Sequence, residues 1–313
     1  MLYYVIKRLL ATIPVMGVVA LFVFSLLYLS PGDPAAVIAG DIATEEDIAR
    51  IRSSLGLDQP YLVRFGHWLG ALARGDLGTS IFTNLPVSHL IAQRVEPTLA
   101  LTLCTLVVSV VIALPLGIIA AARAGGWIDR IVMGISVLGF SIPVFVLAYV
   151  LIGIFSIQLE WLPVQGYRSI SEGFIPFIRH MILPSIALGV IYMALIARIT
   201  RASMLDVLAQ DYVRTAQAKG LAPHTVLIGH ALKNAAIPVV TIIGIGVALL
   251  IGGVVVTETV FAIPGLGRLT VDAILRRDYP IIQGVTLLFS AVYVIVNLLV
   301  DLSYTLFDPR IRY

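Results

Sequence analysis

The sequence predicts an all-α, polytopic membrane protein with about six transmembrane helices. Of its 313 residues, 59% are hydrophobic and 12% are charged, and the mean hydropathy is +1.00. Soluble domains carry about 25% charged residues, so this chain has roughly half the usual share. Its apolar residues also gather in runs of about 20, the length that a helix needs to cross ~30 Å of hydrocarbon. Because no water satisfies the backbone there, such segments must be helical.

Six apolar runs are the expected spans, and they divide the chain into segments. The expected spans are 9–29, 98–122, 131–157, 181–197, 234–257 and 283–305. We expect residues 1–30 to hold a cytoplasmic N-terminal segment and the first helix, followed by a large outside segment at 31–97. Residues 98–305 would form the transmembrane core, which includes a loop at 198–233, and residues 306–313 a cytoplasmic tail.

The first span could be mistaken for a signal peptide, because Lys7 and Arg8 precede it. Its apolar run is longer than the ~7–15 residues of a signal peptide's apolar core. No cleavage site of the small-x-small type stands just after it, since the sequence continues with SPGDP. We therefore expect an uncleaved membrane helix.

The distribution of Lys and Arg orients the spans. With a cytoplasmic N-terminus, the inside segments hold 11 Lys and Arg in 59 residues, and the outside segments hold 10 in 116 residues. All three lysines, Lys7, Lys219 and Lys233, fall inside. This is the positive-inside bias of membrane proteins, so both termini and the 198–233 loop are predicted to be cytoplasmic.

The outside segment contains two expected helices. Thr44 is a typical N-cap residue before an acidic first turn, and Gly56 stands at a C-cap position. A second helix is expected after Pro60, with an apolar face that fits a helix lying in the membrane interface. This helix could be a packed lid over the bundle or a docking surface for an outside partner. The expected face comprises Tyr61, Leu62, Phe65, Trp68, Leu69 and Leu72.

The 198–233 loop is predicted to be a basic helix–turn–helix that protrudes into the cytoplasm. We expect Ser203 as a possible cap, Gly220 as the stop of the first helix, and Pro223 at the start of the second, with Pro238 at the entry to the fifth span. Small residues at the tip would let a groove on another protein close around the turn. The candidate docking residues are Asp211, Tyr212, Arg214, Thr215, Ala216, Ala218, Lys219, Gly220 and Leu221.

Catalytic and metal-binding motifs are scarce in this sequence. It has no G-x-x-x-x-G-K-[ST] phosphate loop and no H-E-x-x-H, so we expect neither ATP hydrolysis nor a metal or cofactor in this chain. The single cysteine, Cys104, excludes an internal disulfide framework. GFSIP at 139–143 lacks the closing glycine of a serine hydrolase motif and fits helix packing better. Asp301 lies inside the last span, where a role at the helix end is favoured over a proton relay.

Small residues recur every four positions in the fifth span. Gly244, Ala248 and Gly252 form this pattern, which lets another helix approach closely. We expect a helix–helix seam there, either within this chain or with a partner chain. Leu250 lies on a different face of the same helix, so Gly252→Leu is expected to impair assembly of the subunit complex more than Leu250→Ala does.

The 198–233 loop resembles a known motif. YVRTAQAKG followed by HALKNAAIPVV is similar to the cytoplasmic EAA loop of permease subunits of binding-protein-dependent ABC importers, closest to the dipeptide, oligopeptide and nickel branch. Arg214 replaces the glutamate of the triplet, Thr215 follows and Ala216 is retained, and Pro238 lies further from Gly220 than in the general pattern, as is usual in the peptide branch. Further matching strings occur in order along the chain: MLYYVIKRLL, SPGDPA, LGLDQP, GDLGTS, ILPSIALG, ETVFAIPGLGRL, RRDYPIIQG and NLLVDLSYTLFDPRIRY.

The resemblance implies a set of partners in the bacterial inner membrane. The chain would pair with a homologous permease subunit as a heterodimer, two ATP-binding subunits would supply energy, and a periplasmic or lipoprotein substrate-binding protein would deliver cargo. Residues 211–222 would be the coupling helix. No nucleic acid or cofactor is implied.

The resemblance leaves the cargo open. It implies dipeptides or oligopeptides, with glutathione or nickel as alternatives, and it assigns no substrate-binding residues in this chain. A secondary transporter is the alternative from another class, but it would use more intramembrane charge than Asp301 alone, and often internal repeats.

Overall fold

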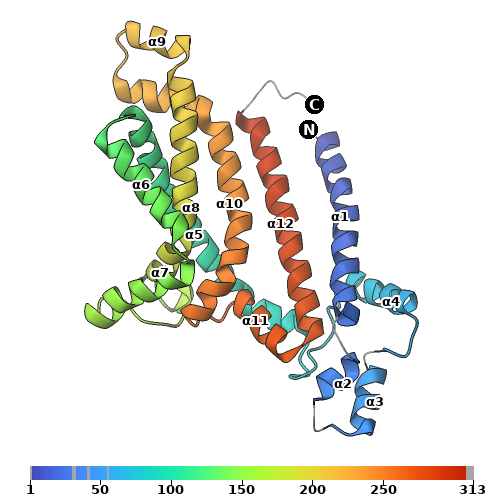
Figure 1. The fold of residues 1–313 in the computed structure, drawn as a ribbon. Helices are drawn as coiled ribbons and strands as arrows, with labels where there is room; N and C mark the ends of the chain where they lie inside the picture. Colours follow the sequence, from blue (N-terminus) through green and yellow to red (C-terminus); the bar gives the residue numbers. More distant parts are fainter. Residues whose placement is uncertain (1, 30–32, 41–42, 55, 308–313) are drawn as a thin grey trace. The chain divides into compact units, whose positions relative to one another are not determined.

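The computed structural model describes residues 2–29, 33–40, 43–54 and 56–307. The all-α prediction is confirmed, because this part of the chain consists of helices and their connections, with one isolated bridge between Thr79 and Pro86. Residues 308–313 of the expected tail lie outside the described residues. The α-helices are α1 Leu2–Leu29, α2 Pro34–Ala39, α3 Glu45–Ser54, α4 Tyr61–Ala73, α5 Val87–Ala122, α6 Trp127–Ser141, α7 Val144–Leu151, α8 Phe174–Leu208, α9 Asp211–Ala218, α10 Lys233–Val260, α11 Leu266–Arg276 and α12 Tyr279–Phe307 (Figure 1).

Five of the expected spans are single helices, and the remaining one is broken. The third expected span coincides with two helices, Trp127–Ser141 and Val144–Gln158, which are bent by 105° at the break between them and form either a broken span or a re-entrant loop. Ile142 is extended there, because the residue before a proline is pushed out of the helical region, and Pro143 has no N–H to donate. The five single candidate spans are Leu10–Leu29, Val87–Ala122, Phe174–Leu208, Thr225–Val247 and Tyr279–Leu302.

Two of these helices are much longer than the bilayer requires. α5 has 36 residues and α8 has 35, about 50 Å each at ~1.5 Å per residue, whereas the bilayer core is ~30 Å thick. Both start or end outside the expected span because their extensions pack in the protein: Val87 and Leu90 of α5 are buried, and so is Met204 of α8.

The chain folds as two compact units that do not follow chain order. One comprises Met1–Val95 and Arg268–Val294, and the other Glu96–Gly267 and Ile295–Tyr313. In the first unit, Ala20, Val23 and Leu287 form a cluster with Trp68 and Leu72. Its loops are joined by polar contacts, since Ser80 Oγ donates to the buried Asp278 carboxylate at 2.5 Å.

The segment between the first two expected spans keeps its expected helix boundaries. Thr44 and Asp47 form reciprocal cap hydrogen bonds at the start of α3, with N···O distances of 3.2–3.3 Å. Gly56, with φ of +62°, follows the end of α3. The expected single apolar face of α4 is divided, however, because Tyr61, Phe65 and Trp68 pack around Phe24 of α1 while Leu62 is exposed.

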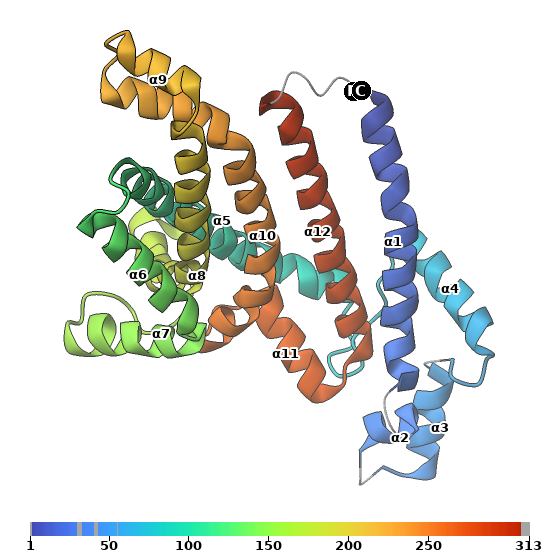
Figure 2. The ribbon, with the colours of Figure 1, turned by 45° about the horizontal axis from the view of Figure 1, so that its top comes forward.

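The second unit is organised around α8 and α10, which lie side by side in Figures 1 and 2. Tyr192 of α8 lies over Gly246, where an added Cβ would come within 1.6 Å of its ring. Its hydroxyl donates to the Ile243 carbonyl at 2.5 Å. Glycine is therefore required at 246, a position that the spacing of small residues did not single out.

The expected seam of the fifth span is only partly found within this chain. Gly244 packs against α12, because a Cβ there would come within 1.9 Å of Val300 Cγ2. Gly252 has no neighbour within 4 Å of its Cβ position, and the side chain of Ala248 lies outside the described ones. Leu250 is 2% exposed in the core. Within this chain Leu250 holds core contacts and Gly252 meets no described neighbour, so the expected effect of Gly252→Leu on assembly with a partner chain stays a prediction.

Candidate functional site

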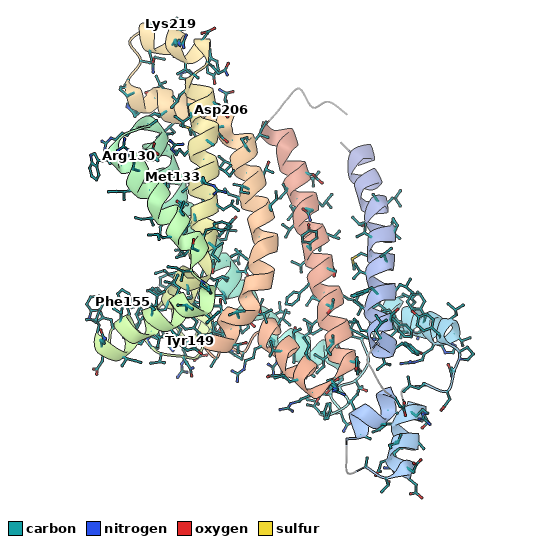
Figure 3. The ribbon with its side chains drawn as sticks, viewed as in Figure 1. Arg130, Met133, Tyr149, Phe155, Asp206 and Lys219 are labelled. Carbon is teal, nitrogen blue, oxygen red and sulfur yellow. The ribbon has the colours of Figure 1, made fainter. Side chains whose placement is uncertain are left out.

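Helix α9 stands at one end of α8 and α10, and most of its residues are exposed. Figure 1 shows it beyond the last turn of α8, and Figure 3 places Lys219 at its far end. α8 runs without interruption to Leu208, so Ser203 lies inside that helix and is not a cap. The prediction of a cap at Ser203 is wrong, because the neighbouring Met204 is fully buried and its packing stabilises the continuation of α8 past this position.

One face of α9 is anchored to the rest of the unit. Val213 and Ala216 are buried against Val226, with Val207 and Leu208 packed beside them. Ala216 therefore points inward, and the prediction that it belongs to the exposed tip is wrong. Its small size serves the close approach of α9 to the segment that follows.

Gly220 ends α9 in the left-handed conformation that the sequence predicts. Its φ is +76°, and its N–H donates to the Gln217 carbonyl at 2.9 Å. The Leu221 N–H donates to the Ala216 carbonyl at 3.4 Å, which completes a Schellman arrangement. The turn is thus set by backbone geometry and leaves the side chains around it free to contact another molecule.

The remaining predicted residues form the exposed face of α9. This face mixes charge with apolar area: Arg214 lies 3.5 Å from Asp211, and Tyr212 and Leu221 are about two-fifths exposed. The Thr215 hydroxyl donates to the Asp211 carbonyl at 3.0 Å. Such a surface suits docking to a protein and offers no group poised for chemistry. The exposed set comprises Asp211, Tyr212, Arg214, Thr215, Ala218, Lys219, Gly220 and Leu221.

The chain returns from α9 to the core through a π-helix. Residues Thr225–Leu232 are π-helical and continue directly into α10, in which Pro238 lies inside the helix. The expected helix after Pro223 is therefore one continuous element with the fifth span. A second apolar cluster holds it in place, with Ala231 and Ala235 packed against Ala121 of α5 and Met204 of α8. Local π-helix is often found where a helix serves a function.

An ion pair that the sequence did not indicate joins α6 to α8 near the same end. Arg201 Nε donates to Asp129 Oδ1 at 2.5 Å, and Nη2 donates to Oδ2 at 2.7 Å. The Gly125 N–H adds a third donor at 2.9 Å. Asp129 is 4% exposed. The sequence offered one indication that these two residues could pair, because both lie in segments expected on the same side of the membrane.

A buried carboxylate organises the opposite end of α10. Thr98 Oγ1 donates to Glu258 Oε1 at 2.6 Å and accepts from the Leu266 N–H at 2.8 Å. Gly265 leaves room for this carboxylate, since a Cβ there would come within 2.0 Å of Oε1. The string ETVFAIPGLGRL thus owes its glycine at 265 to the fully buried Glu258.

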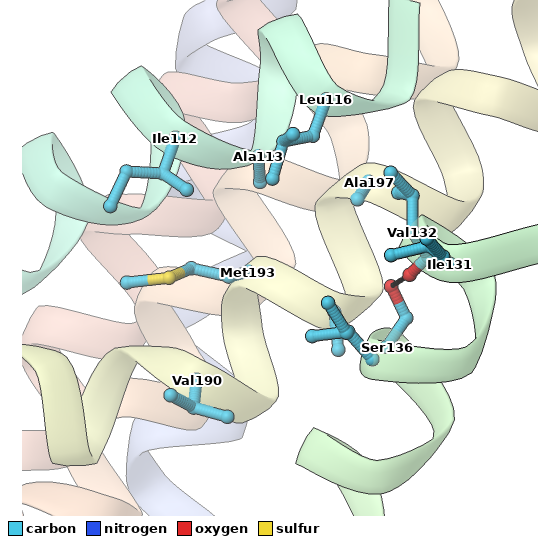
Figure 4. A pocket seen from close by; sticks show the side chains of 11 residues that line it. Ile112, Ala113, Leu116, Ile131, Val132, Ser136, Val190, Met193 and Ala197 are labelled. Atoms are coloured by element: carbon cyan, nitrogen blue, oxygen red, sulfur yellow. Dashed lines mark hydrogen bonds between the residues drawn. The ribbon is translucent and has the colours of Figure 1, made fainter. Parts of the chain in front are cut away.

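An apolar cavity of about 240 Å³ lies between α5, α6 and α8. Figure 4 shows Ile112, Met193 and Val132 around it. Its one hydroxyl, on Ser136, donates to the carbonyl of Val132 at 2.8 Å. A wall of this kind can accept an apolar side chain but provides no set of polar groups for a solute.

Two family models match the chain. The model described as the binding-protein-dependent transport system inner membrane component matches residues 113–313, and its N-terminal counterpart matches residues 1–102. The chain belongs to this family. It is thus a multi-pass membrane permease subunit of an ABC importer.

Relatives of known description cover the whole length of this permease. It is 56% identical over 310 residues to the probable peptide ABC transporter permease protein y4tP of Sinorhizobium fredii, covering 99% of both chains. It is 47% identical over 313 residues to the glutathione transport system permease protein GsiC of Escherichia coli O6:H1, covering 100% of both.

A solved structure shares the fold. A chain of the MetNI methionine ABC transporter, in inward-facing conformations, matches with a TM-score of 0.60 and 19% identity. The match covers 71% of the permease described here and 97% of that chain. It supports the helical architecture of the core.

Proposed function

We propose that this permease subunit conducts short peptides across the bacterial inner membrane. The observation that carries the proposal is the 56% identity, over 99% of both chains, to a permease described as a peptide transporter. The 47% identity to a glutathione permease supports glutathione as a second candidate. Both cargoes are small peptides with charged ends, so one path could serve either.

The path would form between this chain and a second, homologous permease subunit. A substrate-binding protein would deliver cargo from outside, and two separate ATP-binding subunits would hydrolyse ATP. The family description supports dependence on a binding protein. The absence of a phosphate loop from the sequence supports assigning hydrolysis to the partner subunits.

In this proposal α9 is the helix on which an ATP-binding subunit docks. Three features support it: an exposed mixed face, a turn fixed by Gly220, and an apolar anchor at Val213 and Ala216. Because α9 lies between two long continuous helices, a push on it would move α8 and α10 together. This chain would therefore change conformation around the translocation path in response to ATP hydrolysis in the partner subunits.

Uptake by the reconstituted transporter tests the proposal. The complex is placed in vesicles with its binding protein outside and ATP inside, and uptake of labelled di- and tripeptides and of glutathione is measured. We expect ATP-dependent peptide uptake that unlabelled peptide suppresses. Uptake of glutathione without peptide uptake would favour the second candidate. Uptake that persists without ATP would contradict the ABC mechanism in favour of a secondary transporter.

A further inference from the structure

Helix α4 presents a different chemistry on each of three sides. The first side faces α1, where the ring centroid of Phe24 lies 5.3–5.4 Å from those of Tyr61, Phe65 and Trp68. The Tyr61 hydroxyl also lies 2.7 Å from Ser25 Oγ. These contacts fix the rotation of α4 about its own axis, so the directions of its other two sides are determined.

The second side of α4 is cationic. Arg64 and His67 line a cavity of about 440 Å³ that has no acidic residue in its wall. The Arg64 guanidinium lies 5.3 Å from the ring centroids of Phe24 and Tyr28 and donates to the Tyr28 hydroxyl at 2.7 Å. No acid occurs anywhere in Tyr61–Ala73. This side is suited to water and to anionic surroundings.

The third side is apolar and exposed. At about 100° per residue, Leu62, Gly66, Leu69 and Ala73 share one face, opposite Arg64. Leu62 is 76% exposed, and no heavy atom lies within 4 Å of the Cβ position at Gly66. Leu69 is 36% exposed, so the stripe is open to its surroundings at Leu62 and Gly66 and partly covered at Leu69. A protein in water would gain by burying it.

The position of α4 along α1 shows what covers the stripe. α4 contacts α1 at Phe24 and Tyr28, within the last turns of the candidate span that ends at Leu29. Phe24 precedes Leu29 by five residues, which is about 7.5 Å of helix. A helix that lies in the membrane surface sinks its apolar face ~5–10 Å. The stripe on α4 thus lies beside the end of the candidate span, at the depth expected for a helix in the membrane surface.

We propose that α4 lies in the bilayer interface, with Leu62 and Leu69 in the acyl region of the leaflet at the Leu29 end of α1. Arg64 and His67 then face water and the lipid head groups, and Trp68 and Tyr61 sit at the depth where aromatic residues gather. This anchor would hold the folded segment after the first span against the membrane. The proposal does not depend on the cargo or on the role of α9.

Quenching by lipids tests the proposal. In a Cys104→Ser background, single cysteines replace Leu62, Leu69 or, as the matched control on the water side, His67. Each carries an environment-sensitive fluorophore in full-length protein reconstituted into phosphatidylcholine and phosphatidylglycerol bilayers. We expect nitroxide-bearing lipids to quench positions 62 and 69 several-fold more than position 67, and aqueous iodide to quench in the opposite order.

Two results would overturn the proposal. Equal iodide quenching at positions 62 and 67 would place the stripe in water. Shielding of position 62 from both lipid and iodide would show that another protein subunit covers it. Agreement between positions 62 and 69, one on each half of the helix, guards against a local disturbance by the label.

Discussion

Gly220 holds a backbone conformation that a β-branched residue adopts only at a cost. Its φ of +76° is left-handed, and no atom crowds its Cβ position, so the strain of a substitution is conformational and not steric. Gly220→Val should cost about 1–2 kcal/mol in the α9 turn. We expect receptor-stimulated ATP hydrolysis and cargo uptake in vesicles to fall several-fold, while the protein still inserts and accumulates.

Lys219→Ala is the matched control for Gly220→Val. Lys219 is exposed at the end of α9, and an exposed charge contact is typically worth ~0–1 kcal/mol, so its removal should change both rates less. If Gly220→Val left both rates at the wild-type level in a normally assembled complex, the docking role of α9 would have to be abandoned.

Gly244 and Gly252 lie on the same helix, but within this chain we expect glycine to be required only at position 244. Gly244→Leu should destabilise the packing of α10 against α12, because even a Cβ would overlap Val300. Overpacking of this kind costs about 1–3 kcal/mol or more. Gly252→Leu should be tolerated within this chain, where its side is open. The thermal midpoint of each variant of the isolated subunit in mild detergent measures the difference, and equal midpoints would contradict it.

The same comparison shows which single residues could be predicted from the sequence. The capping roles of Thr44 and Gly220 were predicted correctly, because a helix cap depends on the few residues beside it. The buried position of Ala216 could not be predicted, because the segment that packs on it follows a turn whose geometry spacing does not reveal. Spacing alone could not tell that Ala216 meets Val226, or that among the described residues none lies within 4 Å of the Cβ position of Gly252.

At the scale of elements, the Asp129–Arg201 ion pair links α6 to α8. Both carboxylate oxygens accept from the guanidinium, and the carboxylate is nearly buried. Removing Arg201 leaves Asp129 buried and unpaired, which costs ~3 kcal/mol, whereas removing Asp129 leaves the partly exposed Arg201 and should cost less. We expect Asp129→Asn and Arg201→Gln each to lower the thermal midpoint, and the double variant to lose much less than their sum.

A double-mutant cycle on thermal unfolding of the purified subunit measures this coupling. Arg198→Gln serves as the control, because Arg198 lies on the same helix and its guanidinium stands over the ring of Phe140, not beside Asp129. Strictly additive losses for Asp129 and Arg201 would show that the pair contributes no more than two independent contacts.

The spans themselves were well predicted, and their ends were not. Long apolar runs fix the existence of a membrane helix, since the bilayer leaves the backbone no alternative. The ends of α5 and α8 follow instead from protein contacts at Val87 and Met204, which hydropathy does not register. The break at Ile142 and Pro143 had a visible signal, because a proline disfavours helix in the residue before it, but prolines are common inside membrane helices and Pro115 leaves α5 unbroken.

At the scale of the molecule, the two ends of the second unit differ in structure. α9 stands at one end of α8 and α10, and the loops at 159–173 and 261–265 meet at the other, where the Gly166 N–H donates to the Phe261 carbonyl at 2.8 Å. Glu258 and Thr98 stiffen that far end. Long helices joined by buried contacts can carry a displacement from one end to the other, which is what proposed docking at α9 requires.

The proposed docking role of α9 also requires a particular orientation of the chain in the membrane. The excess of Lys and Arg in the inside segments predicts that Lys7, the 198–233 loop and Tyr313 share the cytoplasmic side, with Asp58 on the other. In a Cys104→Ser background, Ala218→Cys and Asp58→Cys are each exposed to an impermeant thiol reagent in intact cells whose outer membrane has been opened. We expect labelling at 58 and protection at 218, reversed for 218 once the inner membrane is broken. Strong labelling of position 218 in intact cells would place α9 away from ATP and would sink both the topology and the proposed docking role at once.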